Sequence, residues 1–327
     1  MKIPGGMAHR VALSCILASA AGFAAAAEGY PAKLVRIVVP FAAGGSTDLL
    51  ARSIAQRLND AWKQPVIVDN RAGGGGIVGS EHVAKAPADG YTLLLGTVTT
   101  HGVAPSLYRK LPYDAQRDFA PITELASIPQ LLSVHPSLPV RSVRELVTLA
   151  RTRPGELNYG TAGNGSASHM AMALFESATK ARMTHVPYKG SGPALTDLLG
   201  GHLSLMFDVI MTSLPHIQSG KLRTLGSSSL QRSTVIPEVP TVAESGYPGY
   251  EAMVWFGLFA PAATPPDTVR RVQEDVARAL QGPAMRDLLA SQGLVVVAST
   301  PAEFSKRVGA EIGKWRKVIQ DAGIKLE

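Results

Sequence analysis

The chain has 327 residues, of which 46% are hydrophobic and 17% are charged, and its net charge at neutral pH is +7. This length exceeds the usual size of one hydrophobic core, so two domains, or one domain with a large insertion, are expected. Lys and Arg are scattered instead of clustering with aromatic residues, which argues against nucleic-acid binding. The mild positive net charge would suit an anionic small molecule.

The first 27 residues have the layout of a secretory signal peptide. Lys2 and Arg10 precede an apolar run from Val11 to Phe23, and four alanines ending at Ala27 follow. The run is shorter than the roughly 20 residues that a membrane span requires. Cleavage is expected after Ala27, which would release the mature chain into the periplasm.

Cys15 is the only cysteine, and it lies within the apolar run. The residues before it weakly resemble a lipoprotein acylation site, so lipidation stays open as an alternative. After cleavage the chain would have no cysteine and would depend on its core for stability. No later segment is apolar enough to cross a membrane, and a soluble monomer without a cofactor is expected.

Strands and helices are predicted to alternate along the mature chain, first from about residue 34 and again from about residue 157. The first series has strands at 34–40, 65–69 and 91–95, a helix with Leu50, Ile54 and Leu58 on one face, and a helical stretch through Val83. The second series has strands at 157–160, 185–187 and 202–210, with a helix containing Met170, Leu174 and Phe175.

This repeated pattern predicts an α/β protein of two lobes with a mixed, largely parallel sheet in each. The extended segments 119–136 and 250–265 are expected to cross between the lobes as a two-crossing hinge. The helices predicted at 266–280 and 301–322 would then return to the first lobe. The expected domains are a signal peptide at 1–27, a first lobe of 28–126 plus 253–327, and a second lobe of 127–252.

Glycine-rich turns follow several predicted strands, and such turns can be part of nucleotide-binding sites. Residues 41–47 contain no Gly-Lys-Ser/Thr, so a phosphate-binding P-loop is excluded. Gly74, Gly76 and Gly79 fit G-x-G-x-x-G, but residues 95–100 contain no carboxylate for a ribose. A dinucleotide site is therefore not expected.

Glycines that open a helix allow backbone N–H groups to approach an anion, and the helix N-terminus adds partial positive charge. Five consecutive small residues at 42–46 exceed what a turn needs, and 162–166 is a comparable loop. We therefore expect these two loops, one in each lobe, to hold a carboxylate in a shared cleft. The loop at 73–76 is as consistent with a plain turn as with a binding role.

Several side chains near these loops have alternative roles. Ser46 or Thr47 is expected to cap the first helix and Ser166 its counterpart. Asp48 is expected to serve its own helix, because it would repel an anion.

Other polar residues lie at strand ends or within turns. His101 is assigned either to a ligand or to a plain loop, and His169 to a local structural contact. Arg71 would pair with a carboxylate of the ligand or across its own turn. Asp208 would either accept a hydrogen bond from the ligand or cap a loop.

No catalytic or metal motif stands out. The sequence has no G-x-S-x-G, no pair of histidines at zinc-binding spacing and no cysteine in the mature part. We therefore expect no enzyme, no catalytic residue and no metal, with an exported hydrolase using Ser166 and His169 as the remaining enzymatic alternative.

Several motifs occur in the order typical of one family. They include "VPFAAGGSTD", "VDNRAGGGGIVG", "GTVTTHGVAPSLY", "NYGTAGNGSASH", "VPYKGSGPALTDLLGGHLSLMFD", "VPTVAESGYPGYE" and "WFGLFAPAATP". From about Tyr30 to its end the chain resembles the Bug family, the periplasmic solute receptors related to the TctC protein of tripartite tricarboxylate transporters.

The resemblance implies a two-lobed periplasmic binding protein of the Venus flytrap, type II-like fold, which closes over a small carboxylic acid. It implies these ligand-binding residues: Phe41, Ala43, Gly44, Gly45, Ser46, Thr47, Thr97, Thr100, His101, Ala162, Gly163, Asn164, Gly165, Ser166 and Asp208. The implied partners are a di- or tricarboxylate, an acidic amino acid or an aromatic acid, and the membrane permease subunits of the transporter. A ligand-sensing partner of a membrane sensor kinase is the alternative.

Overall fold

The computed structural model describes residues 29–324. The expected signal peptide and Cys15 lie outside these residues. Within them, no helix combines the length and apolarity needed to cross a membrane.

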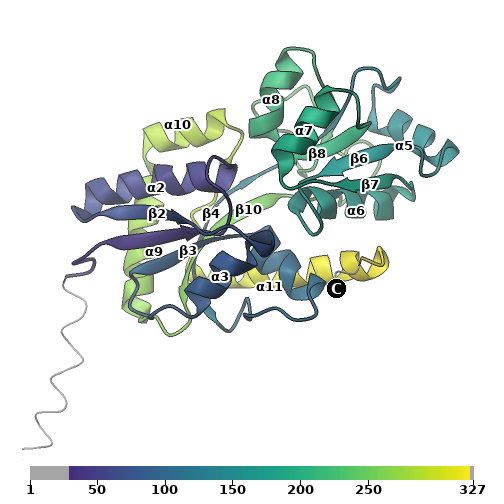
Figure 1. Ribbon diagram of the computed structural model, residues 1–327. Coiled ribbons are helices and arrows are strands. Elements are labelled where there is room, and N and C mark those ends of the chain that lie inside the picture. Colours follow the sequence, from purple (N-terminus) through teal and green to yellow (C-terminus); the bar gives the residue numbers. More distant parts are fainter. Residues whose placement is uncertain (1–28, 325–327) are drawn as a thin grey trace, which may run out of the picture.

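Two β-sheets organise the molecule, one in each lobe (Figure 1). The first sheet has the order β11-β4-β10-β3-β1-β2, with β1 (Val35–Val39), β2 (Val66–Asn70), β3 (Thr92–Thr97), β4 (Phe119–Ile128), β10 (Val254–Pro261) and β11 (Val295–Val296). The second has the order β7-β6-β8-β5-β9, with β5 (Gln130–Val134), β6 (Asn158–Thr161), β7 (Thr184–Pro187), β8 (Leu205–Val209) and β9 (Arg223–Ser227).

The two sheets share one plan, as the repeated sequence pattern predicted. In each, the first strand of the series lies between the second and the third and is parallel to both. The remaining strands, β10, β4 and β11 in one sheet and β5 and β9 in the other, pair antiparallel. The sheets are therefore mixed, as expected: the βαβ series supplies the parallel pairs, and the strands next to the hinge run opposite to that series.

The chain passes between the sheets in two places. Only Pro129 separates β4 of the first sheet from β5 of the second. The return runs from β9 to β10 through a segment held on the second lobe, where Ser228 N donates to Gln130 O (2.8 Å) and Ala252 N donates to Ser228 O (2.9 Å). Both crossings thus lie side by side at the base of the second sheet.

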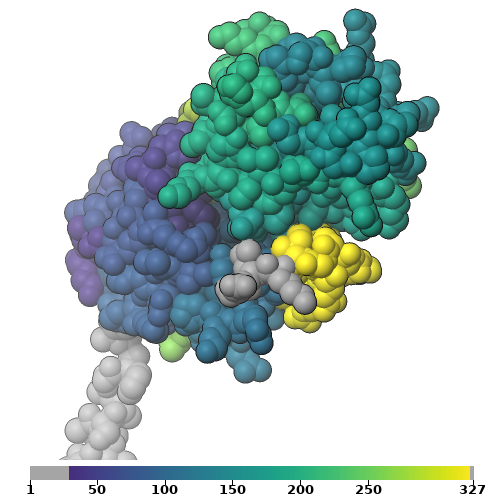
Figure 2. Space-filling model, turned by 45° about the vertical axis from the view of Figure 1, so that its right-hand side comes forward, coloured from purple at the N-terminus to yellow at the C-terminus, as the bar shows by residue number. Residues whose placement is uncertain are grey.

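Helices cover both sheets, and the last ones pack on the first sheet. Trp62 at the end of α2 (Ser46–Trp62) donates its Nε1–H to Asp275 of α9 (Pro266–Gln281) (2.5 Å). The final helix packs against β4 and also touches α6 (Ala167–Thr179) of the second lobe, below which it lies in Figures 1 and 2. The helices are α2 (Ser46–Trp62), η1 (Gly74–Gly76), α3 (Ile77–Ala84), η2 (Val98–Val103), α4 (Ala104–Leu107), α5 (Val143–Thr152), α6 (Ala167–Thr179), α7 (Ser191–Leu199), α8 (Ile210–Gln218), α9 (Pro266–Gln281), α10 (Pro283–Ser291) and α11 (Pro301–Asp321).

Candidate ligand-binding site

The loops after β1, β2 and β3 meet at one edge of the first sheet, because these three strands are parallel. Gly76 is the point of contact, with a φ of +96°. A Cβ at this position would lie 2.5 Å from Cγ2 of Thr100 and 3.2 Å from Cζ of Phe41. A glycine is therefore required at residue 76 for the three loops to come together.

The loop at 41–48 leaves the N-terminus of α2 without a side-chain cap. The helix begins at Ser46, and Gly45 is the N-cap residue, with φ −82° and ψ 171°. The expectation that Ser46 or Thr47 caps this helix was wrong, because the extended cap position falls one residue earlier, on a residue with no side chain. The residues from Ala42 to Gly45 are exposed, so this helix end combines accessible backbone with partial positive charge.

Asp48 holds this loop in place from inside. Its Oδ2 accepts hydrogen bonds from Gly44 N (2.9 Å) and Arg52 Nε (3.0 Å), and its Oδ1 accepts from Asn70 Nδ2 (3.0 Å). Burial alone would raise the pKa of Asp48, but the bonds from Arg52, Gly44 and Asn70 together lower it. The predicted local role of Asp48 is confirmed. The role of Asn70 was missed, and its position at the end of β2 was the only signal for it.

Thr97, Thr100 and His101 belong to the π-helical turn η2 and its start. Thr100 Oγ1 accepts from Thr97 N (3.0 Å) and lies 2.9 Å from Nδ1 of His101. The imidazole of His101 is fully buried and stacked on Phe259, with ring centroids 4.1 Å apart. Burial lowers the pKa of His101 to about 3. Its side chain therefore supports Thr100 from the core, and a direct contact of His101 with a ligand stays a prediction.

Thr97 is the N-cap residue of η2, and its side chain is buried. Arg71, on the neighbouring loop, forms an ion pair across the turn, in which its Nε lies 2.9 Å from Oδ2 of Asp69. The second of the two roles expected for Arg71 is thus the one found.

In the second lobe, the loop between β6 and α6 has a side-chain cap. Ser166 is the N-cap residue, and its hydroxyl accepts a hydrogen bond from His169 N (3.3 Å), as predicted. The same histidine accepts from Gly165 N through its Nδ1 (3.0 Å). His169 therefore has the local structural role expected of it.

Two further N–H groups of this loop are already bound. Ala162 N donates to Ser168 Oγ (3.0 Å), and Gly163 N donates to Thr161 Oγ1 (3.2 Å). A ligand would therefore find fewer free backbone donors here than the glycine pattern predicted. Asn164 stays exposed at the tip of the loop.

A stack of rings lies beneath this loop. The rings of His169 and His185 are 4.1 Å apart and nearly parallel, and Tyr159 stacks on the other face of His185 at 5.0 Å. Burial, followed by the charge of His185, lowers the pKa of His169 to about 4, and burial lowers the pKa of His185. Both imidazoles are therefore neutral at pH 7. The part played by His185 was missed, because nothing local in the sequence marks it.

Asp208 lies at the same sheet edge as Ala162. Gly160 of β6 is opposite Met206 of the parallel strand β8. Ala162 and Asp208 each lie two residues beyond this pair, so they occupy the same level at the carboxyl end of the sheet. The carboxyl of Asp208 is almost fully buried and accepts from Thr212 Oγ1 (2.5 Å) and Ser213 Oγ (3.2 Å). Burial raises its pKa to about 6 despite these bonds.

The two lobes meet close to these loops. Leu49 and Leu50 of α2, Met211 of α8 and Leu288 of α10 line one cavity of about 290 Å³. Since α8 follows Asp208 and α2 follows the 41–45 loop, this contact brings the two sheet edges near each other. Figure 2 shows purple atoms of the first lobe bordering green atoms of the second.

Among residues 29–324, no group of His, Cys, Asp or Glu is arranged to hold a metal ion.

Comparisons with known proteins agree with this architecture. The family model for the tripartite tricarboxylate transporter family receptor matches residues 50–324. Protein BugT of Bordetella pertussis is 39% identical over 324 residues, which cover 98% of this chain and 99% of BugT.

Two solved structures with bound acids are also similar. The R. palustris protein Rpa4515 with adipate is 41% identical, with a TM-score of 0.85 and coverage of 90% of this chain and 99% of that chain. MatC from Rhodopseudomonas palustris with bound malate is 35% identical, with a TM-score of 0.81 and coverage of 89% of this chain and 100% of MatC. The chain therefore belongs to the tripartite tricarboxylate transporter receptor family, a family of non-enzymatic periplasmic solute-binding receptors.

Proposed function

We propose that this chain is an exported solute receptor that binds a small carboxylate between its lobes and delivers it to the permease subunits of a tripartite tricarboxylate-type transporter. The observation that carries the proposal is the uncapped N-terminus of α2, which begins after four exposed small residues. An uncapped helix end offers several N–H donors and partial positive charge to an anion. The adipate and malate bound by related receptors support the choice of carboxylates.

In this proposal the two loops contribute differently to ligand binding. The first loop supplies backbone donors from Gly45, Ser46 and Thr47. The second supplies side-chain groups from Asn164 and Ser166, because Ala162, Gly163 and Gly165 already donate within the loop. Asp208, with its raised pKa, would accept from a hydroxyl or amine of the ligand or donate when protonated.

A thermal-shift panel tests the proposal with dicarboxylates, tricarboxylates, acidic amino acids and aromatic acids. A true ligand at about 100 times its Kd adds about 2.7 kcal/mol to the free energy of unfolding. We expect at least one acid to raise the melting temperature by several degrees. A panel in which no carboxylate changes the melting temperature, while an ester or amide is hydrolysed, would contradict the proposal.

A further inference from the structure

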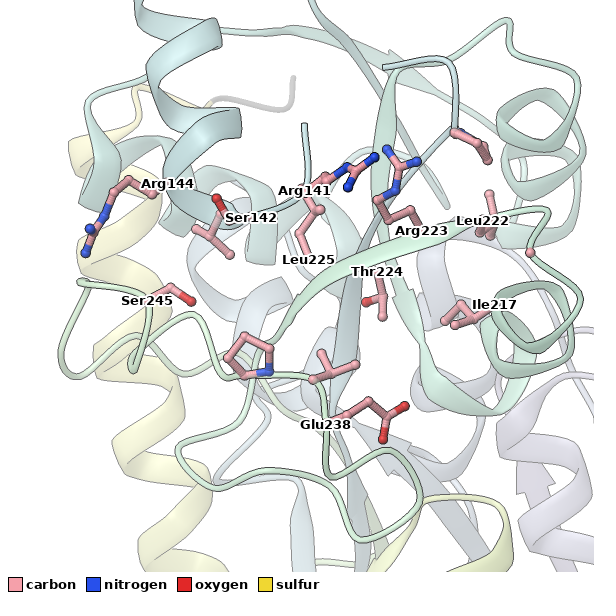
Figure 3. Close-up of a pocket in the computed structure, with 15 residues that line it drawn as sticks. Arg141, Ser142, Arg144, Ile217, Leu222, Arg223, Thr224, Leu225, Glu238 and Ser245 are labelled. Carbon is pink, nitrogen blue, oxygen red and sulfur yellow. The ribbon is translucent and has the colours of Figure 1, made fainter. Parts of the chain in front are cut away.

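An open cavity of about 760 Å³ lies at the surface of the second lobe, and none of its lining residues belongs to either glycine loop (Figure 3). Its walls come from the start of α5, the start of β9, the turn after α8 and the segment around Pro240. Its size falls within the range of about 300–1,000 Å³ that is typical of pockets for small organic ligands. Nothing in the proposed function uses this cavity.

Arg223 marks one end of the cavity. Its side chain is half-buried, and its Nη1 donates to two neutral acceptors, Leu138 O (3.2 Å) and Val140 O (3.0 Å). No carboxylate from residues 29–324 forms an ion pair with it, whereas other arginines of the chain, such as Arg232 with Glu244, do have one. A partly desolvated guanidinium held only by carbonyls favours an anion as its remaining partner.

Arg141 adds a second positive charge at the same end. It follows Val140, whose carbonyl accepts from Arg223, and its side chain is exposed. In Figure 3 the guanidinium groups of Arg141 and Arg223 both lie toward the upper end of the hollow, while Arg144 points to the other side. The nearby N-terminus of α5 is not the source of this positive charge, because Ser142 and Glu145 already cap it.

The rest of the cavity differs in character. Apolar side chains of Ile217, Leu222, Leu225 and Val239 form much of its lining. Glu238 lies away from the two guanidinium groups, across the hollow in Figure 3. The cavity thus has a positive end, an apolar middle and one carboxylate at the opposite side.

We propose that this cavity is a second binding site, which takes an organic monocarboxylate with an apolar chain. The carboxylate binds Arg141 and Arg223, and the chain lies on the apolar lining. Glu238 repels a second carboxylate at the far end of the ligand and favours an ammonium group there. The site therefore prefers monocarboxylates and ω-amino acids to the diacids expected between the lobes, and it stands whether or not the interlobe proposal holds.

Isothermal titration calorimetry with hexanoate, its ω-amino derivative and adipate tests this site. The protein variants are the full mature chain, Gly44→Val, Arg141→Gln, Arg223→Gln and Glu238→Gln. We expect hexanoate to bind in this cavity with the same affinity in the wild type and in Gly44→Val, because residue 44 is not part of the cavity. Arg141→Gln should weaken hexanoate binding by about tenfold or more, since a charge-assisted contact is lost.

Arg153→Gln provides a matched control, because it removes the same charge from the exposed surface of the second lobe outside the cavity. It should leave the hexanoate affinity unchanged. In the Gly44→Val background, Glu238→Gln should improve adipate binding relative to hexanoate. Absence of hexanoate binding at millimolar concentration, survival of that binding in Arg141→Gln, or its loss in Gly44→Val would each overturn the proposal. If Arg223→Gln fails to fold, Arg141→Gln still decides.

Discussion

The two glycine loops look alike in sequence but are held in different ways. In the first, Gly45 occupies the N-cap of α2 without a side-chain bond, and the buried carboxylate of Asp48 fixes the loop. In the second, Ser166 caps α6, and the neutral groups of Thr161, Ser168 and His169 bind the loop N–H groups. A glycine pattern therefore predicts accessible backbone, but the capping of the helix decides whether its donors remain available to a ligand.

Replacing Gly44 and Gly45 by valine should have the largest effect. Gly44 has a φ of +86°, which a β-branched residue adopts only with strain, and the new side chains would cover the end of α2. If two charge-assisted bonds are lost, the affinity for the acid found in the thermal-shift panel should fall more than about 100-fold. Asn164→Ala in the second loop should cost about tenfold at most. Calorimetry on folded variants compares the two, and equal losses would remove the proposed difference between the loops.

The second loop should respond to acid before the first. The pKa of His169 is lowered in the folded state, so its contribution to stability is complete above the unfolded value of about 6.5 and is lost as the pH falls toward 4. This loss is on the order of 3 kcal/mol in the free energy of unfolding. The difference in stability between the wild type and His169→Asn should therefore shrink from pH 7 to pH 4. Urea unfolding across this range measures it, and a constant difference would refute the assignment.

Asp48→Asn should loosen the first loop at neutral pH. The variant keeps the shape of the side chain but loses the charge that Gly44, Asn70 and the half-exposed Arg52 stabilise. We expect the free energy of unfolding to fall by about 2 kcal/mol. The loss is no larger because Arg52 is partly exposed, and solvent screens its charge. Because the folded pKa of Asp48 is lowered, this loss should vanish as the pH falls through that value. Urea unfolding and amide exchange at Gly44 report on both effects.

The smallest effect is expected for the cap itself. Ser166→Ala should cost about 1 kcal/mol, the usual contribution of a serine N-cap. Ser46→Ala at the matching end of α2 should stay within about 0.5 kcal/mol, because Ser46 is not the cap. Denaturant midpoints of the two variants compare them directly. A larger loss at Ser46 than at Ser166 would reverse the capping difference between the loops.

Much of the fold followed from local patterns. The apolar strand at 34–40 and the helix faces at residues 50, 54 and 58 were predicted because alternation and helical spacing are short-range properties. The cap at Ser166 was also local, since its partner is three residues away. The position of the other cap, at Gly45, could not be predicted from local sequence, because Ser46, Thr47 and Asp48 are all good N-cap residues by type. The loop is also held by hydrogen bonds from Asn70 to Asp48 and to Phe41 O, which join residues far apart in sequence.

The α/β series, its repetition, the family resemblance and the two loops where an anion is expected could all be predicted from the residues alone. Which groups of those loops remain available depends on how distant segments pack together. His101 became a core residue because Phe259, 158 positions away, stacks on it, and His169 was neutralised by burial against His185. The spatial neighbours of a side chain set its burial, its pKa and its remaining hydrogen bonds, and those neighbours come from other strands of the sheet.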